Sequence, residues 1–226
     1  MLDSRVGSHN GASRGAVVAM LVLSMCGIAA AASKNQLEAV SHDGLELTKS
    51  SKVDVLYKRP GATLESYKKL MLDPVSVAFR KDWKPSSAQV SSSDRERIRS
   101  DVAEEFRKVF TEELQKKGGY QIVDAAGPDV LRVSAAVVDL YINAPDTMQP
   151  GRSRTYTTSA GEMTLIAELR DSESGQILAR AADHKDASSS TSLTWTNSLT
   201  NAADARRMMQ SWAKTLRSAL DAAREH

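Results

Sequence analysis

An alternating stretch at residues 162–183 limits the possible folds of this chain more than any other segment. Apolar residues recur at every second position in its first half, and this period places alternate side chains on opposite faces of a β-strand. The residues expected to face a core are Met163, Leu165, Ala167 and Leu169. The residues expected to face mostly water are Thr164, Glu168 and Arg170. The stretch therefore predicts a half-buried hairpin.

The turn of this hairpin reads D-S-E-S-G. Asp171 can bond its own backbone two residues further on, and Gly175 can adopt a left-handed conformation at little steric cost. A four-residue loop pairs Leu169 with Leu178, whereas a five-residue loop pairs Leu169 with Ile177. We predict the four-residue loop, with Gly175 left-handed.

Two segments carry apolar residues at spacings of three and four, which predicts amphipathic helices that pack on a sheet. The first begins at Ser93, where Glu96 completes a capping box, and ends at Gly118. Its apolar stripe is Ile98, Val102, Phe106, Val109, Phe110 and Leu114. The second helix begins near Asn201, and its stripe is Ala205, Met208, Met209, Trp212, Leu216, Ala219 and Leu220.

Four more stretches predict strands, at residues 52–57, 67–79, 120–123 and 130–142. Pro74 interrupts the second one and indicates an edge, a bulge or a bend, because proline donates no hydrogen bond to a ladder. Polar residues at 143–160 and 186–200 predict loops. The order of elements predicts a single two-layer α+β domain at 52–226, with an antiparallel or mixed sheet of about five strands and two main helices on one face.

The N-terminus predicts export. Arg5 and Arg14 precede an apolar run at residues 16–32 that ends in small residues, which is the order of a secretory signal peptide at residues 1–32. We expect the polar residues 33–51 to form a flexible N-terminal extension.

Two cleavage sites compete in this leader. The A-A-A sequence at 30–32, before Ser33, fits the small-residue rule of signal peptidase. The L-S-M-C sequence at 23–26 resembles a bacterial lipobox with Met25 in place of a small residue, and cleavage there would make Cys26 a lipidation site. We expect cleavage after Ala32 and a soluble periplasmic product. The second site would give an outer-membrane lipoprotein that faces the periplasm.

Charge and cysteine content exclude several classes of protein. The 30 basic and 28 acidic residues are spread along the chain, and a net charge of +2 gives no field that favours nucleic acid. Cys26 is the one cysteine, so the product cleaved after Ala32 has no thiol nucleophile, disulfide or thiolate metal site. No metal-binding or cofactor-binding motif is present, and we expect no cofactor.

Few residues suggest a site. Arg152, Arg154 and Tyr156 form a candidate interaction patch on a long loop, where binding residues often lie. His184 is expected to be a solvated loop histidine, since no serine lies in a G-x-S-x-G context. Glu168 is expected to face water beside Arg170 or Arg180.

A second carboxylate, Asp139, lies in a mostly apolar strand, where it caps a neighbouring backbone or marks a strand end. A single carboxylate defines no mechanism, so we predict no catalytic residue.

Several phrases together resemble one family. They are D-G-L at 43–45, Y-K-R-P-G-A at 57–62, L-D-P-V-S-V-A-F at 72–79, G-P-D-V-L at 127–131, A-G-E-M-T-L-I-A-E-L-R-D-S at 160–172 and S-W-A-K-T-L-R at 211–217. The chain resembles the domain of unknown function 3313, found in exported proteins and lipoproteins of Gram-negative bacteria. The resemblance implies a cell-envelope location and assigns no role to any residue.

The sequence thus predicts a non-enzymatic envelope protein that binds or supports a partner. The expected partners are an envelope protein, peptidoglycan or a membrane-associated component, with membrane contact only if Cys26 is acylated. The alternative is a periplasmic hydrolase with a site between the 152–160 loop and His184.

Overall fold

The computed structural model describes residues 38–83, 90–142, 155–157, 161–186, 194–196 and 198–225. None of the helices in these ranges is long and apolar enough to cross a bilayer.

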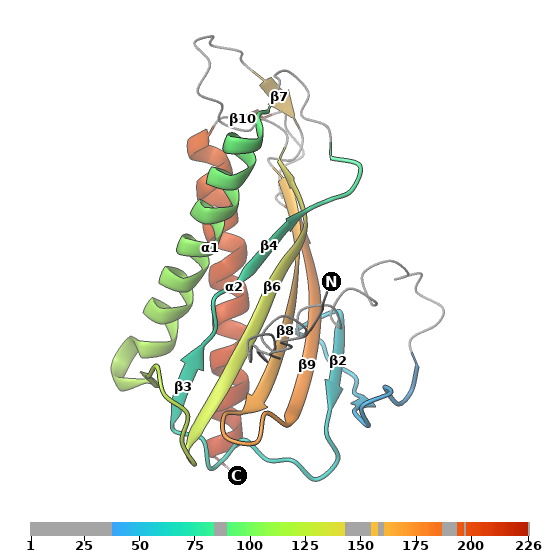
Figure 1. Cartoon of the computed structure of the whole chain (residues 1–226), viewed down its shortest axis with the longest axis vertical. Helices are drawn as coiled ribbons and strands as arrows, with labels where there is room; N and C mark the ends of the chain where they lie inside the picture. The colour runs from blue at the N-terminus through green and yellow to red at the C-terminus, as the bar shows by residue number, and fades with distance from the viewer. Residues whose placement is uncertain are drawn as a thin grey trace, which may run out of the picture. The chain divides into compact units, whose positions relative to one another are not determined.

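Eight strands in the described part of the chain form one mixed sheet, ordered β1–β2–β9–β8–β6–β3–β5, with β4 also paired to β6 (Figure 1). They are β1 (Glu46–Leu47), β2 (Val55–Lys58), β3 (Lys69–Leu72), β4 (Ser76–Phe79), β5 (Gln121–Ile122), β6 (Val130–Ile142), β8 (Gly161–Asp171) and β9 (Ile177–Asp186). Neighbours from β1 to β6 run antiparallel, whereas β3 and β4 run parallel to β6, and β5 runs parallel to β3. The α+β class is confirmed, but the sheet is larger than predicted.

The additional strands are short, so they leave little periodic signal in the sequence. Pro74 lies in the gap between β3 and β4, which both pair with β6, and the predicted interruption at this proline is confirmed. A separate antiparallel pair joins β7 (Thr155–Thr157) to β10 (Thr194–Thr196). The two predicted loops at 143–160 and 186–200 therefore each contain a three-residue strand.

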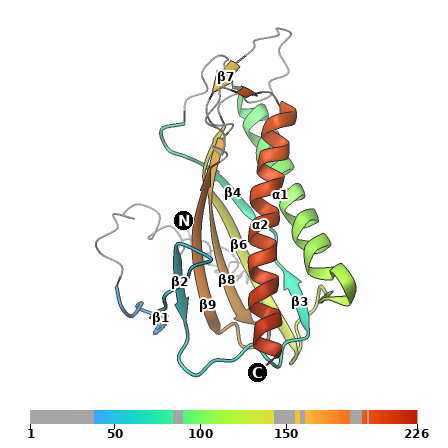
Figure 2. The same cartoon turned by 180° about the vertical axis from the view of Figure 1, so that it is seen from behind.

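Two helices, α1 (Ser92–Gln115) and α2 (Ser198–Arg224), lie side by side in both views of the molecule (Figures 1 and 2). A short 3₁₀-helix, η1 (Lys116–Gly118), follows α1. The N-cap of α1 is Ser91, whose hydroxyl accepts from the Asp94 N–H at 3.0 Å, and Asp94 Oδ2 accepts from the Ser91 N–H at 3.1 Å. The predicted capping box at Ser93 and Glu96 is wrong by two residues, because a serine with an acidic residue three positions later also occurs at Ser91.

Both helices bury most of their predicted stripes in one core with the sheet. The core includes Ile98, Phe106, Val109, Phe110 and Leu114 of α1, Met209, Trp212, Ala213 and Leu220 of α2, and Leu131, Val137, Met163 and Leu165 of the sheet. Ala219 is exposed, and Ala213 takes its place in the stripe with no exposed surface. Ala213 follows Met209 by four residues, so it continues the buried face of α2.

The hairpin β8–β9 confirms the left-handed Gly175, at φ 71°, and corrects the predicted register. Leu169 pairs with Ala179 and Arg170 pairs with Ile177, so Leu178 is an extra residue in a β-bulge. Leu178 is buried in the core, which the bulge makes possible.

Residues 39–48, predicted as part of the flexible extension at 33–51, form a small hairpin at the sheet edge. Val40 bridges Glu46, and Glu46–Leu47 pair with β2 as strand β1. Leu45 has 0% of its surface exposed. We call these residues the N-terminal hairpin. Its polar composition has no regular period, so the sequence pattern did not reveal it.

Truncation of Trp212 tests the packing of α2 on the sheet. The side chain is 2% exposed, and its indole N–H donates to Asp183 Oδ2 at 2.8 Å. Trp212→Ala should lower the free energy of unfolding in urea by about 3–5 kcal/mol, because it leaves a cavity and removes one hydrogen-bond donor from the buried Asp183 carboxylate. Ser211→Ala on the exposed side of the same helix should change it by no more than about 0.5 kcal/mol. A loss under about 1 kcal/mol in Trp212→Ala would contradict this packing.

Candidate functional site

The face of the sheet that points away from the core carries a group of paired charges, which we call the outer-face cluster. It consists of Asp43, Glu168, Arg170 and Arg180. Because Met163 and Leu165 point into the core, the residues that alternate with them, including Glu168 and Arg170, lie on the outer face. Arg180 lies directly opposite Glu168 on β9.

Glu168 is the centre of this cluster and is only 3% exposed. Arg180 Nε donates to its Oε1 at 2.7 Å, and Arg170 Nε donates to its Oε2 at 3.1 Å. The predicted pairing with Arg170 or Arg180 is confirmed for both arginines, whereas the predicted exposure of Glu168 to water is wrong. Pairing on both oxygens offsets the cost of removing the carboxylate from water.

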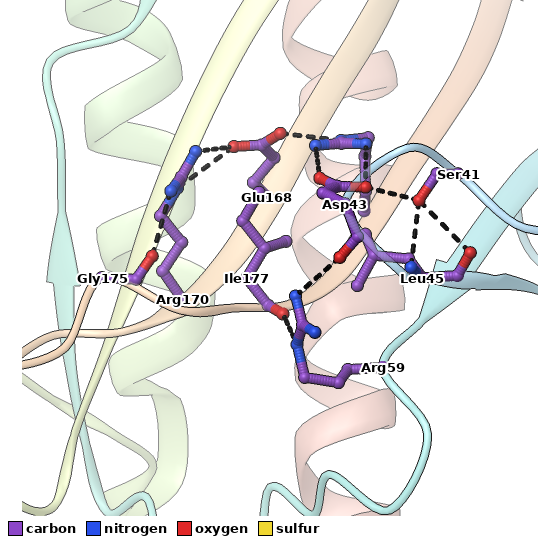
Figure 3. Close-up of polar contacts among 9 residues, drawn as sticks. Ser41, Asp43, Leu45, Arg59, Glu168, Arg170, Gly175 and Ile177 are labelled. Atoms are coloured by element: carbon purple, nitrogen blue, oxygen red, sulfur yellow. Dashed lines mark hydrogen bonds and ion pairs between the residues drawn. The ribbon is translucent and has the colours of Figure 1, made fainter.

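The N-terminal hairpin supplies the second carboxylate of the cluster (Figure 3). Arg180 Nη2 donates to Asp43 Oδ2 at 2.6 Å, and the Ser41 hydroxyl donates to Asp43 Oδ1. Arg59 joins the backbone of the hairpin to β9, because its Nε donates to the Ile177 carbonyl at 2.6 Å and its Nη2 donates to the Asp43 carbonyl at 3.3 Å. Segments more than a hundred residues apart in the sequence thus meet at Arg180.

These contacts change the proton affinity of Asp43. Partial burial by itself raises the pKa of Asp43. Hydrogen bonds from Ser41 and Arg180 and the positive charge of Arg180 outweigh this effect and lower the pKa to about 2. Burial lowers the pKa of Arg180, and its hydrogen bonds with Asp43 and Glu168 outweigh this and raise it above its ordinary value. Both groups are therefore charged at neutral pH.

The polar surface extends from the cluster across β6 to the loop after β3. Ser134 pairs with Glu168 and Arg132 pairs with Arg170 in the register of β6 and β8. The carboxylate of Asp73 accepts from Arg132 Nε at 2.8 Å and from the Ser134 hydroxyl at 2.5 Å. A band of compensated charges therefore runs from the N-terminal hairpin to Asp73.

The outer-face cluster joins β8, β9 and the N-terminal hairpin to one another, and it does not place Glu168 for proton transfer. Both Glu168 oxygens accept from guanidinium groups, which keep their protons, so Glu168 is not placed as a general base. Two carboxylates face two guanidiniums in the cluster, and its formal charge is therefore balanced.

His184 lies in β9 rather than in a loop, and 45% of its side chain is exposed. Its Nδ1 is 3.1 Å from the Thr164 hydroxyl, and its Nε2 is 3.6 Å from Glu162 Oε2. The second distance exceeds that of a hydrogen bond, so this trio lacks the contact that would orient a catalytic histidine. Glu162 instead forms an ion pair with Arg80.

Other predicted positions have different outcomes. Asp139 has a left-handed backbone, at φ 52°, within the bulge that interrupts the pairing of β6 with β8, so it marks an irregularity inside the strand. Aspartate tolerates this conformation better than most residues.

Arg152, Arg154 and Cys26 lie outside the described residues, and Tyr156 belongs to β7. Among the described residues, no group of three or more metal-ligating side chains gathers.

A family model described as "Protein of unknown function (DUF3313)" matches residues 35–216. The chain belongs to this family. The match covers the N-terminal hairpin, the whole sheet and most of α2, and it confirms the resemblance seen in the sequence phrases. No curated protein matches the chain.

The solved structures that the chain resembles are distant. The PelC dodecamer from Paraburkholderia phytofirmans is 14% identical with a TM-score of 0.38, and the match covers 72% of this chain and 98% of that chain. A protein of the DUF330 family from Xanthomonas campestris is 13% identical with a TM-score of 0.40, covering 80% and 97% of the two chains. A neuraminyllactose-binding hemagglutinin homologue from Helicobacter pylori is 10% identical with a TM-score of 0.30, covering 73% and 93%.

Replacing Glu168 tests whether the outer-face cluster stabilises the fold. Glu168→Gln keeps the shape of the side chain but leaves two arginines with less negative charge, so it should lower the free energy of unfolding by about 3 kcal/mol. Glu173→Gln, at an exposed position of the β8–β9 turn, should change it by less than about 0.5 kcal/mol. Equal urea midpoints for the two variants would show that the cluster contributes nothing to stability.

The lowered pKa of Asp43 predicts acid sensitivity. A carboxylate with a pKa near 3.8 in the unfolded chain and about 2 in the folded chain stabilises the fold fully above pH 3.8, and this contribution is lost as the pH falls through 2. Asp43→Asn should reduce the fall in unfolding free energy over this range, measured by urea unfolding at successive pH values. Ser41→Ala should have an intermediate effect, because Arg180 still binds Asp43. An unchanged pH profile in Asp43→Asn would contradict the proposed pairing.

Proposed function

We propose that this chain is an exported cell-envelope protein with a non-enzymatic role, binding or supporting a partner in the periplasm or at the outer membrane. The basic, apolar and small-residue order of residues 1–32 supports export. The expected partners are an envelope protein, peptidoglycan or a membrane-associated component.

The observation that carries this proposal is the way charged groups are used on the outer face. Glu168, the most buried carboxylate described, is held by two arginines, and Asp43 and Asp73 each accept from an arginine and a serine. Such groups fix elements relative to one another, whereas a catalytic acid or base needs a proton that it can exchange with a substrate. The arrangement suits a rigid module that presents a surface to a partner.

Fractionation of a C-terminally tagged chain in a Gram-negative host tests this proposal. We expect a mature N-terminus at Ser33 by mass spectrometry, and protein in the periplasmic fraction that retains a cross-linked envelope component. Combined Arg152→Ala, Arg154→Ala and Tyr156→Ala substitutions should reduce this retention if the 152–156 patch contacts the partner. The matched control is Arg97→Ala and Arg99→Ala on α1.

Three outcomes would contradict parts of the proposal. A cytoplasmic product would exclude export, and acylated Cys26 would exclude the soluble form. A chain that retains no envelope component but turns over an envelope substrate, with the activity lost in His184→Ala, would favour the hydrolase. The contact between His184 and the Thr164 hydroxyl is the observation on the side of that alternative.

A further inference from the structure

The N-terminal hairpin is attached to the sheet by a small set of local contacts. Its strand β1 pairs with β2 over two residues, and Asp43 binds Arg180. Leu45 is completely buried but does not belong to the main core cluster. Its burial therefore depends on the hairpin and its immediate surroundings, as in the satellite clusters found beneath surface segments.

The surface beneath the hairpin has a defined chemistry. Without the hairpin, Glu168 would remain as the carboxylate shared by Arg170 and Arg180, and Arg59 would lose its contact with the Asp43 carbonyl (Figure 3). Positive charge would then exceed negative charge at this place. The Leu56 carbonyl of β2 would lose the hydrogen bond that it accepts from the Thr48 N–H at 2.7 Å. Strand β2 would then have an unpaired edge. The surface therefore fits a turn that carries a carboxylate two residues before a leucine and that leads into a strand paired with β2.

The residues that connect the hairpin to β2 form a suitable hinge. Residues 49–52 are all exposed, and the local hydrogen bonds described there are those that the Ser50 hydroxyl accepts from the N–H groups of Lys52 and Val53. Asp54 is the first residue fixed to the sheet beyond them, because its N–H donates to Asp183 Oδ1. Residues 49–53 can extend over about 17 Å.

We propose that this surface is an acceptor site for the N-terminal hairpin, and that it also takes the hairpin of a second copy of this chain. A second copy carries the same S-x-D-x-L pattern at 41–45, so each contact with Arg180, β2 and the leucine position can form between two chains as it does within one. Reciprocal exchange gives a closed two-fold dimer in which each chain completes the cluster of the other. This inference goes beyond the proposed function and does not depend on which envelope component the protein binds.

A disulfide trap tests the exchange in the exported chain carrying Cys26→Ser, so that introduced cysteines are the only thiols. Glu46 and Lys58 are exposed and lie directly opposite each other on β1 and β2, at the separation that a disulfide requires. One chain carries Glu46→Cys and a second, of different tag length, carries Lys58→Cys. We expect mixing under mild oxidation to give a disulfide-linked heterodimer. The control mixture pairs Glu46→Cys with Glu65→Cys, which is exposed but not opposite β1.

A second variant separates exchange from random collision. Adding Asp43→Asn and Leu45→Ala to the Glu46→Cys chain weakens the hairpin equally in the closed chain and in the exchanged dimer, so the final yield of heterodimer should not change. The heterodimer should instead form roughly tenfold faster, because the closed hairpin opens more readily without one charged hydrogen bond and one buried leucine. Exposed cysteines that merely collide on closed chains would react at the same rate with and without these substitutions. The proposal is overturned if the heterodimer does not exceed the control mixture, or if its rate of formation does not rise in the substituted chain.

Discussion

The burial of the Glu168 carboxylate constrains most of this structure. An isolated carboxylate at such a position costs several kcal/mol, and the cost is offset only when its oxygens are paired with good geometry. Arg170 and Arg180 provide that pairing from neighbouring positions of β8 and β9. The register of the hairpin, its bulge at Leu178 and the position of the N-terminal hairpin are all compatible with this single arrangement of charges.

The two faces of the sheet are stabilised by different forces. One face packs against α1 and α2 through apolar side chains, which carry no charge that changes with pH. The other face is held by hydrogen-bonded charges, whose contribution changes with protonation. Asp183 connects the two layers, because it lies on the core side of β9 and accepts from both the Trp212 indole and the Asp54 N–H.

Membership in the DUF3313 family assigns no activity to this chain, and the proposed function depends on how the chain uses its polar groups. The described outer-face carboxylates are engaged by arginines and serines, an arrangement that favours attachment over proton transfer. The N-terminal hairpin is held in the same way, because its one carboxylate in the cluster, Asp43, forms an ion pair with Arg180. The proposed exchange of this edge hairpin and the proposed accessory role in the cell envelope both rest on these paired charges.

The sequence alone determined the elements whose side chains follow a regular period. These are α1, α2, β6 and the β8–β9 hairpin, together with the left-handed Gly175 and the break at Pro74. Local sequence also indicated that Glu168 pairs with Arg170 or Arg180, and the structure shows pairing with both. Only the tertiary structure decided that Glu168 is buried, that Leu178 is bulged and that residues 39–48 complete the sheet. The reason is physical: a period reports one face of one element, whereas the pairing of Asp43 with Arg180 joins positions 137 residues apart and leaves no local pattern.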